Sequence, residues 1–204
     1  NGSVTFEEDG NIQQATTSDA DLGGSDTIST GNGEDIVIGG TTADTIDAGT
    51  DASGDNQRDI VLGDSGTANF DHQGRIDEIY SIDTSIGDTD QISTGGGDDI
   101  VIGGTGKDTI NTESGDDIVI GDSGKATFNS DLDQLSDPNH IGILRTFETI
   151  TSAIGDSDQI TTDEGKDIVL GGAANDTITA YLNNEVERDI VLGDNGSVTF
   201  EEDG

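Results

Sequence analysis

The apolar residues in the middle of this chain recur at fixed intervals. Ile92, Val101, Ile110 and Val119 stand nine residues apart, and each follows an Asp by two positions. The residues beside each aliphatic alternate in direction as in a short β-strand, and these stretches show no 3.6-residue helical period. Glycines between them supply the positive φ angles that tight turns need. The pattern therefore predicts short strands, each followed by a tight turn.

Longer repeats divide the chain into three units. The octapeptides GEDIVIGG, GDDIVIGG and GKDIVLGG begin at Gly33, Gly97 and Gly165. The units are expected to span residues 1–64, 65–122 and 123–194, and each holds a linking cassette followed by a repeat region. The cassettes are 7–22, 71–86 and 129–154, and the repeat regions are 23–64, 87–122 and 155–194. Residues 195–204 are identical to residues 1–10. This identity predicts that the chain is a window from a longer tandem array.

Asp residues mark the same position in every nonapeptide. The twelve are Asp26, Asp35, Asp44, Asp59, Asp90, Asp99, Asp108, Asp117, Asp158, Asp167, Asp176 and Asp189. The stretch from Gly103 to Asn111 reads GGTGKDTIN, which fits G-G-x-G-x-D-x-U-x at every fixed position. The sequence thus resembles the RTX (hemolysin-type) calcium-binding β-roll. The pattern is imperfect elsewhere, since Thr42 and Ala174 stand where a third glycine is expected.

The resemblance implies an all-β fold, in which parallel β-roll or β-solenoid units carry Ca²⁺ in their turns and short cassettes join the units. Two nonapeptides would form one turn of a flattened right-handed solenoid, so that residues eighteen apart stack. The stacked pairs would be Asp26 with Asp44, Asp90 with Asp108, Asp99 with Asp117, and Asp158 with Asp176.

Net charge supports bound cations. The chain has 44 Asp and Glu residues against 7 Lys and Arg residues, a formal charge of −37. Stacked carboxylates repel one another unless a cation lies between them, and several hard oxygen ligands favour Ca²⁺. We expect multiple Ca²⁺ ions, with further ligand candidates in Asp64, Asp122 and Asp194, which end the units, and in Asp88 and Asp156, which lie in shortened first turns.

The same composition excludes several partners and chemistries. A chain without a basic patch has no means to bind nucleic acid through phosphates, and no apolar run approaches the length of a membrane span. Cys is absent. His72 and His140 lie outside the repeated motifs, and no G-x-S-x-G nucleophile elbow occurs. We therefore expect no enzyme.

Each unit closes on the motif G-D-[SN]-G-x-x-x-F. In this motif Ala68, Ala126 and Val198 replace the ligand Asp. Phe70, Phe128 and Phe200 take the aliphatic position. We interpret these segments as terminating coils of the rolls. The cassettes are expected to form a short strand pair or an irregular cover, and residues 131–140 a surface loop in which Asp131 has no ligand role.

Every second nonapeptide is apolar on both faces. Its outward pairs are Ile36/Ile38, Ile60/Leu62, Ile100/Ile102, Ile118/Ile120, Ile168/Leu170 and Ile190/Leu192. A strand that is apolar on both sides is buried on both sides. The cover is either the chain's own cassettes or identical chains in a filament, and contacts of Ile100 and Ile102 with Ile79 or Phe147 would indicate the cassettes.

Three functions fit these features. The first is a non-catalytic structural segment of a long, calcium-stabilised extracellular fibre or cell-surface protein, which the tandem copies favour. The second is the calcium-binding region of a secreted RTX toxin or hydrolase. The third is an adhesin or an ice- or glycan-binding module. In each case we expect secretion, because calcium is scarce inside cells and the chain needs it to fold.

Overall fold

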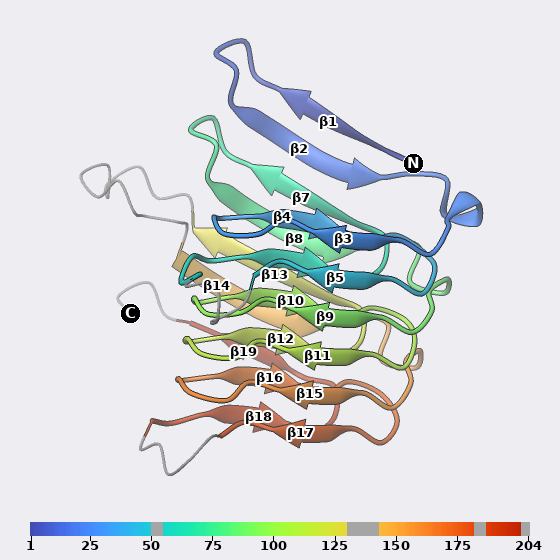
Figure 1. The fold of residues 1–204 in the computed structure, drawn as a ribbon, viewed down its shortest axis with the longest axis vertical. Coiled ribbons are helices and arrows are strands. Elements are labelled where there is room, and N and C mark those ends of the chain that lie inside the picture. The colour runs from blue at the N-terminus through green and yellow to red at the C-terminus, as the bar shows by residue number, and fades with distance from the viewer. Residues whose placement is uncertain (50–54, 130–142, 182–186, 201–204) are drawn as a thin grey trace.

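The protein is built from three stacked β-sheets (Figure 1). The computed structural model describes residues 1–49, 55–129, 143–181 and 187–200. Within these ranges there is no α-helix, and the one helical element is a 3-10 turn, η1, at Ala20–Leu22. The predicted all-β class with parallel β-roll sheets is confirmed.

Two parallel six-stranded sheets form the roll. We call the first the polar sheet, with strands β3 (Thr27–Ser29), β5 (Thr45–Asp47), β9 (Gln91–Ser93), β11 (Thr109–Asn111), β15 (Gln159–Thr161) and β17 (Thr177–Thr179). We call the second the middle sheet, with strands β4 (Ile36–Ile38), β6 (Ile60–Leu62), β10 (Ile100–Ile102), β12 (Ile118–Ile120), β16 (Ile168–Leu170) and β18 (Ile190–Leu192). Consecutive repeats alternate between the two sheets, as the nine-residue period predicts.

The repeat regions of the three units stack into one unbroken roll. Gln91 of β9 is in register with Thr45 of the first unit on one side and with Thr109 of its own unit on the other. Strand β12 likewise pairs with β16 of the third unit. The chain therefore leaves the roll at the end of a unit, forms a hairpin, and returns to continue the same two sheets.

The hairpins form the third layer, which we call the cover sheet. It is antiparallel, in the order β1 (Gly2–Phe6), β2 (Ile12–Thr17), β7 (Gly66–Phe70), β8 (Ile76–Ser81), β13 (Gly124–Asn129), β14 (Ile143–Thr149) and β19 (Ser197–Thr199). The expectation of a short strand pair in the cassettes is partly met, because β2, β8 and β14 lie in them. The prediction that the closing motifs form terminating coils is wrong, since they supply β7, β13 and β19 of the cover sheet.

An inner core fills the space between the polar and middle sheets. It consists of the inward aliphatics of the strands together with Ala48, which follows β5. The buried aliphatics are Val37, Ile46, Val61, Ile92, Val101, Ile110, Val119, Ile160 and Val169. Each inward side chain stacks on the same position of the next coil, as in the pairs Val61–Val101 and Val101–Val119. The core is therefore a one-dimensional stack that any number of coils can extend.

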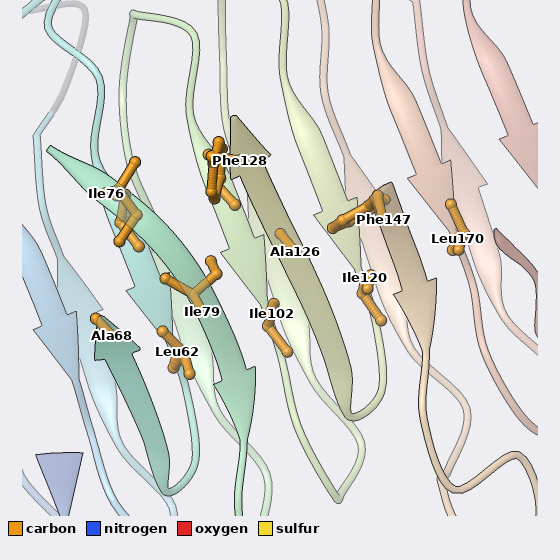
Figure 2. Packing of buried hydrophobic residues seen from close by; sticks show 12 residues of the cluster. Leu62, Ala68, Ile76, Ile79, Ile102, Ile120, Ala126, Phe128, Phe147 and Leu170 are labelled. Atoms are coloured by element: carbon orange, nitrogen blue, oxygen red, sulfur yellow. The ribbon is translucent and has the colours of Figure 1, made fainter. Parts of the chain in front are cut away.

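An outer core lies between the middle and cover sheets (Figure 2). Ile100 and Ile102 belong to the same buried cluster as Ile79 and Phe147. The chain's own cover sheet therefore buries these strands, which is one of the two alternatives proposed from the sequence. In the middle of the roll this face is not available to an identical chain, since Ile100 and Ile102 are each only 1% exposed.

Candidate calcium-binding turns

The repeated Asp residues form two columns along the turns of the roll. The first column runs Asp26, Asp44, Asp90, Asp108, Asp158, Asp176. The second runs Asp35, Asp59, Asp99, Asp117, Asp167, Asp189. The four stacked pairs expected from the eighteen-residue spacing are all present. The parallel register of the sheets causes this order, because each Asp directly precedes a strand in register with the strand of the next coil.

Each column is joined by a repeated hydrogen bond. The backbone N–H of one Asp donates to Oδ1 of the Asp in the next coil, at 2.7–3.0 Å in the first column. The corresponding distances in the second column are 2.8–3.2 Å. One carboxylate oxygen of each acceptor is therefore used to align the coils, and the other is left for a different partner.

The second oxygen of most of these carboxylates is buried without a hydrogen bond. Oδ2 has no partner in Asp44, Asp90, Asp108, Asp158 and Asp176 of the first column, or in Asp35, Asp59, Asp99 and Asp117 of the second. A buried, unpaired carboxylate oxygen is costly. An orphaned oxygen that recurs in coil after coil is what a set of cation sites requires.

Glycine carbonyls converge on the same points. A Cβ added to Gly103 would lie 2.1 Å from the carbonyl oxygen of Gly121 and 2.7 Å from Oδ2 of Asp108. Gly63 and Gly121 have the same surroundings, one coil earlier and one coil later. A carboxylate oxygen and a main-chain carbonyl oxygen thus lie close together beside a position that only glycine fits. Such hard oxygen donors fit Ca²⁺.

Burial raises the pKa of these carboxyls, and neighbouring carboxylates raise it further. The pKa is raised to about 7 for Asp59, Asp90 and Asp99, to about 8 for Asp108, and to about 9 for Asp117 and Asp158. For Asp108 the largest cause is desolvation, with Asp90, Asp64 and Asp122 as the nearby negative charges. The folded chain alone therefore disfavours the ionised state, and Ca²⁺ supplies the positive charge that offsets it.

Asp64 and Asp122 also point into the turns of the first column. Oδ2 of Asp64 accepts the backbone N–H of Thr105 at 2.6 Å, and Asp122 accepts the N–H of Ala173. In both residues Oδ1 is buried without a partner. Burial raises the pKa of Asp64 to about 8 and that of Asp122 to about 6. Both fit their predicted place as additional ligands.

The remaining candidates lie on the surface or at the ends of the roll. The side chains of Asp88 and Asp156 are exposed, and it is their backbone amides that interact with Asp64 and Asp122. Asp26 and Asp194 are also exposed, at the first and last coils. Asp131 and the predicted loop 131–140 lie outside the described residues.

Sequence reasoning expected ligands from turn carbonyls as well as from Asp, but it missed the contribution of threonine. Among the described residues no three His, Asp or Glu side chains converge on one point, so oxygens other than those of carboxylates, such as main-chain carbonyls, would complete an ion's shell. The Thr162 hydroxyl donates to Oδ2 of Asp167 at 2.5 Å, and Thr94 and Thr112 occupy the same position, fully buried, before Asp99 and Asp117. The signal was a Thr five residues before each of these Asp residues.

Comparison with known families agrees with this geometry. The profile of the RTX calcium-binding nonapeptide repeat matches residues 22–52, 87–127 and 154–184, which together make up half of the chain. The chain belongs to this family, and its repeats bind multiple Ca²⁺ ions. Proteins with RTX repeats are typically secreted. Neither the curated proteins nor the solved structures contain a match to the chain. None of the helical residues that the structure describes could cross a bilayer.

Proposed function

We propose that this chain is a non-catalytic structural segment of a long, calcium-stabilised extracellular fibre or cell-surface protein. The observation that carries the proposal is the unbroken stacking of the three units. Strand β10 pairs with β6 of the preceding unit in the same register as with β12 of its own unit. The unit boundary is therefore no hinge, and repeated units add length to one stiff solenoid.

The geometry sets the length that each copy contributes. One copy supplies six strands to each roll sheet, and strands lie about 4.8 Å apart in the hydrogen-bonding direction. A 194-residue copy would therefore extend the fibre by about 29 Å. Hydrogen bonds, inner core and Asp columns all run along this axis, so the segment resists bending between copies.

Calcium would determine where the fibre becomes rigid. The buried carboxyls oppose folding when no cation is bound, and extracellular calcium-binding modules have dissociation constants of roughly 10⁻⁴–10⁻³ M. Such affinities leave the chain unfolded in a cytosol that is poor in calcium and order it after export. The proposed extracellular location rests on this coupling.

The proposal can be tested with genetically linked copies. Proteins of one, two and three copies are compared in Ca²⁺ by small-angle X-ray scattering and electron microscopy. The maximum dimension should grow by about 29 Å per copy, with no increase in cross-section. A dimension that grows less than linearly, or images of compact beads on a flexible string, would overturn the structural role. The same proteins in chelator are the control, and they should lose the rod shape.

A further inference from the structure

The N-terminal end of the solenoid has an overhanging hairpin with exposed apolar side chains. Figure 1 places β1 and β2 beyond β3 and β4 at this end. Phe6 is 61% exposed, although Phe128 at the same repeat position is 5% exposed, and Ile12 is 37% exposed against 3% for Ile76. The cover sheet thus extends past the roll that it should cover.

Among the described residues, the middle sheet is incompletely covered at the C-terminal end of the solenoid. Strand β18 ends the middle sheet, and its Ile190 is 40% exposed, although Ile100 and Ile102 are 1% exposed at outward positions of β10. Val191, which belongs to the inward column, is 46% exposed, and β18 is the last strand of its sheet in the described part of the chain. The two ends therefore expose complementary apolar surfaces.

A cavity at the N-terminal end matches a carboxylate at the C-terminal end. It has a volume of about 180 Å³ and is lined by residues that include Asn1, Gly23, Gly40 and Thr41. The glycines at the same repeat position as Gly40 are Gly104 and Gly172, and each faces a carboxylate: a Cβ there would lie 2.5 Å from Oδ2 of Asp64 and 2.3 Å from Oδ2 of Asp122. At Gly40 no atom of the described residues lies within 4 Å of such a Cβ.

The carboxylate that fits this cavity belongs to Asp194. Asp64 and Asp122 lie two residues before β7 and β13, and Asp194, at the same repeat position, lies three residues before β19. Residues 195–200 have the sequence of residues 1–6. Strand β19 already lies against β14 through Val198 and Phe147, and β1 lies against β2 through Val4 and Ala15. The same sequence therefore pairs with β14 at the C-terminal end of the solenoid and with β2 at the N-terminal end.

We propose that the N-terminal end of the roll docks the C-terminal end of a second copy of this chain, with residues 194–200 of that copy replacing β1 beside β2. Asp194 then enters the cavity beside Gly40 and Thr41, and the overhanging β2 covers the open β18. The second Asp column would also continue. If copies repeat every 194 residues, Asp35 of the following copy lies 40 residues after Asp189. Asp59 and Asp99, which are joined by a hydrogen bond, are separated by the same number of residues.

This inference names the partner within the proposed fibre and rests on that proposal. It is tested in trans with unlinked chains in Ca²⁺, by sedimentation velocity and electron microscopy over a concentration series. The full chain should form linear oligomers that lengthen with concentration. A variant without residues 1–10 should assemble at a roughly tenfold lower concentration, because no resident strand has to be displaced.

Two substitutions in the shortened chain test the cavity. Asp194→Asn should raise the assembly concentration several-fold, whereas Asp47→Asn, on the exposed face of β5, should leave it unchanged. If the two variants assemble alike, Asp194 does not fill the cavity. If the shortened chain folds by circular dichroism but stays monomeric, or forms only lateral bundles, the docking is refuted.

A second measurement tests the docking even if the shortened chain does not fold. A free peptide with the sequence of residues 1–10 is added in excess to the full chain, and it should shorten the oligomers by occupying the strand position beside β2 and β14. Unchanged oligomer length would overturn the exchange of strands. Linked copies that form rods while single chains remain monomeric would refute only this docking, whereas flexible linked copies would refute the proposed function itself.

Discussion

The backbone N–H of Asp90 donates to Oδ1 of Asp108 at 2.8 Å, and the other oxygen of Asp108 is buried without a partner. One carboxylate therefore aligns two coils and also presents a free oxygen toward the carbonyl of Gly121. The first of these interactions needs no metal. The second leaves a buried negative charge that the chain does not neutralise, so the same residue both builds the roll and makes it depend on a cation.

Asp108→Asn is expected to have opposite effects with and without calcium. The amide keeps an acceptor oxygen for the N–H of Asp90. It removes a carboxyl group whose pKa burial raises to about 8. In chelator the variant should be more stable, by on the order of a few kcal/mol. In Ca²⁺ it should be less stable than the wild type. Urea unfolding measures the effect in Ca²⁺, and the amount of β-structure seen by circular dichroism in chelator between pH 5 and pH 8 measures the effect without metal. A shift of the same sign in both would contradict a ligand role. Asp47→Asn is the matched exposed control.

Gly103→Ala should disrupt a site, because its new methyl group would displace the oxygens beside it. The new Cβ would lie 2.1 Å from the Gly121 carbonyl oxygen and 2.7 Å from Oδ2 of Asp108. Gly193→Ala is the matched control, because it changes the same repeat position in the last coil, where no atom of the described residues lies within 4 Å of the new Cβ. A calcium titration followed by circular dichroism should show a higher midpoint for Gly103→Ala only. Equal midpoints for the two variants would argue against coordination at these turns.

Acidification should partly replace calcium. Burial raises the pKa of Asp108 to about 8 and of Asp117 to about 9, above the ordinary value of 3.8. The unfolded chain ionises first as the pH rises. The stability of the metal-free roll is therefore greatest below about pH 4 and is lost progressively up to about pH 9. In chelator, β-structure measured by circular dichroism should increase from pH 8 to pH 5, and a decrease would contradict the assigned burial of these carboxyls.

Phe128→Ala should destabilise the cover sheet, whereas Phe6→Ala should not. Both residues occupy the same repeat position, but Phe128 is 5% exposed in the outer core and Phe6 is 61% exposed. Truncation of a buried Phe typically costs about 3–5 kcal/mol. Thermal unfolding of monomeric chain in Ca²⁺ should show a large loss for Phe128→Ala and almost none for Phe6→Ala. Similar losses would mean that the hairpins are not packed as described.

The stacking of Asp pairs eighteen residues apart could be predicted because it depends on local spacing alone. An Asp every nine residues, with a turn between strands, places Asp90 over Asp108 and Asp99 over Asp117. The inward and outward faces followed from the same alternation. The doubly apolar strands also showed that a third layer or a partner was needed, although not which of them it was.

The closing motifs were misassigned because their spacing imitates another coil. Phe70 follows Val61 by nine residues, so it fits the aliphatic position of a nonapeptide. The structure instead turns Gly66–Phe70 outward as β7, where Ala68 packs in the outer core and Gly66 lies against Leu62. Nine-residue spacing cannot separate a parallel coil from a hairpin strand. The lost Asp at Ala68 was the signal, since a strand outside the roll holds no ion.

Continuity of the roll across units could not be derived from local spacing either. Asp44 and Asp90 are 46 residues apart, and Asp108 and Asp158 are 50 apart, yet both pairs make the same hydrogen bond as residues eighteen apart. The intervening hairpin leaves the roll and returns without changing the register. Contacts of this kind join segments that are distant in sequence.

The most direct test of the account is the secondary structure of the chain with and without calcium at neutral pH. Far-ultraviolet circular dichroism is recorded in excess chelator and again after addition of millimolar Ca²⁺, with Mg²⁺ as the control cation. The account predicts a disordered spectrum in chelator, a β-sheet spectrum in Ca²⁺, and little change in Mg²⁺, which dehydrates reluctantly and demands octahedral geometry. A β-sheet spectrum that persists unchanged in excess chelator would contradict it.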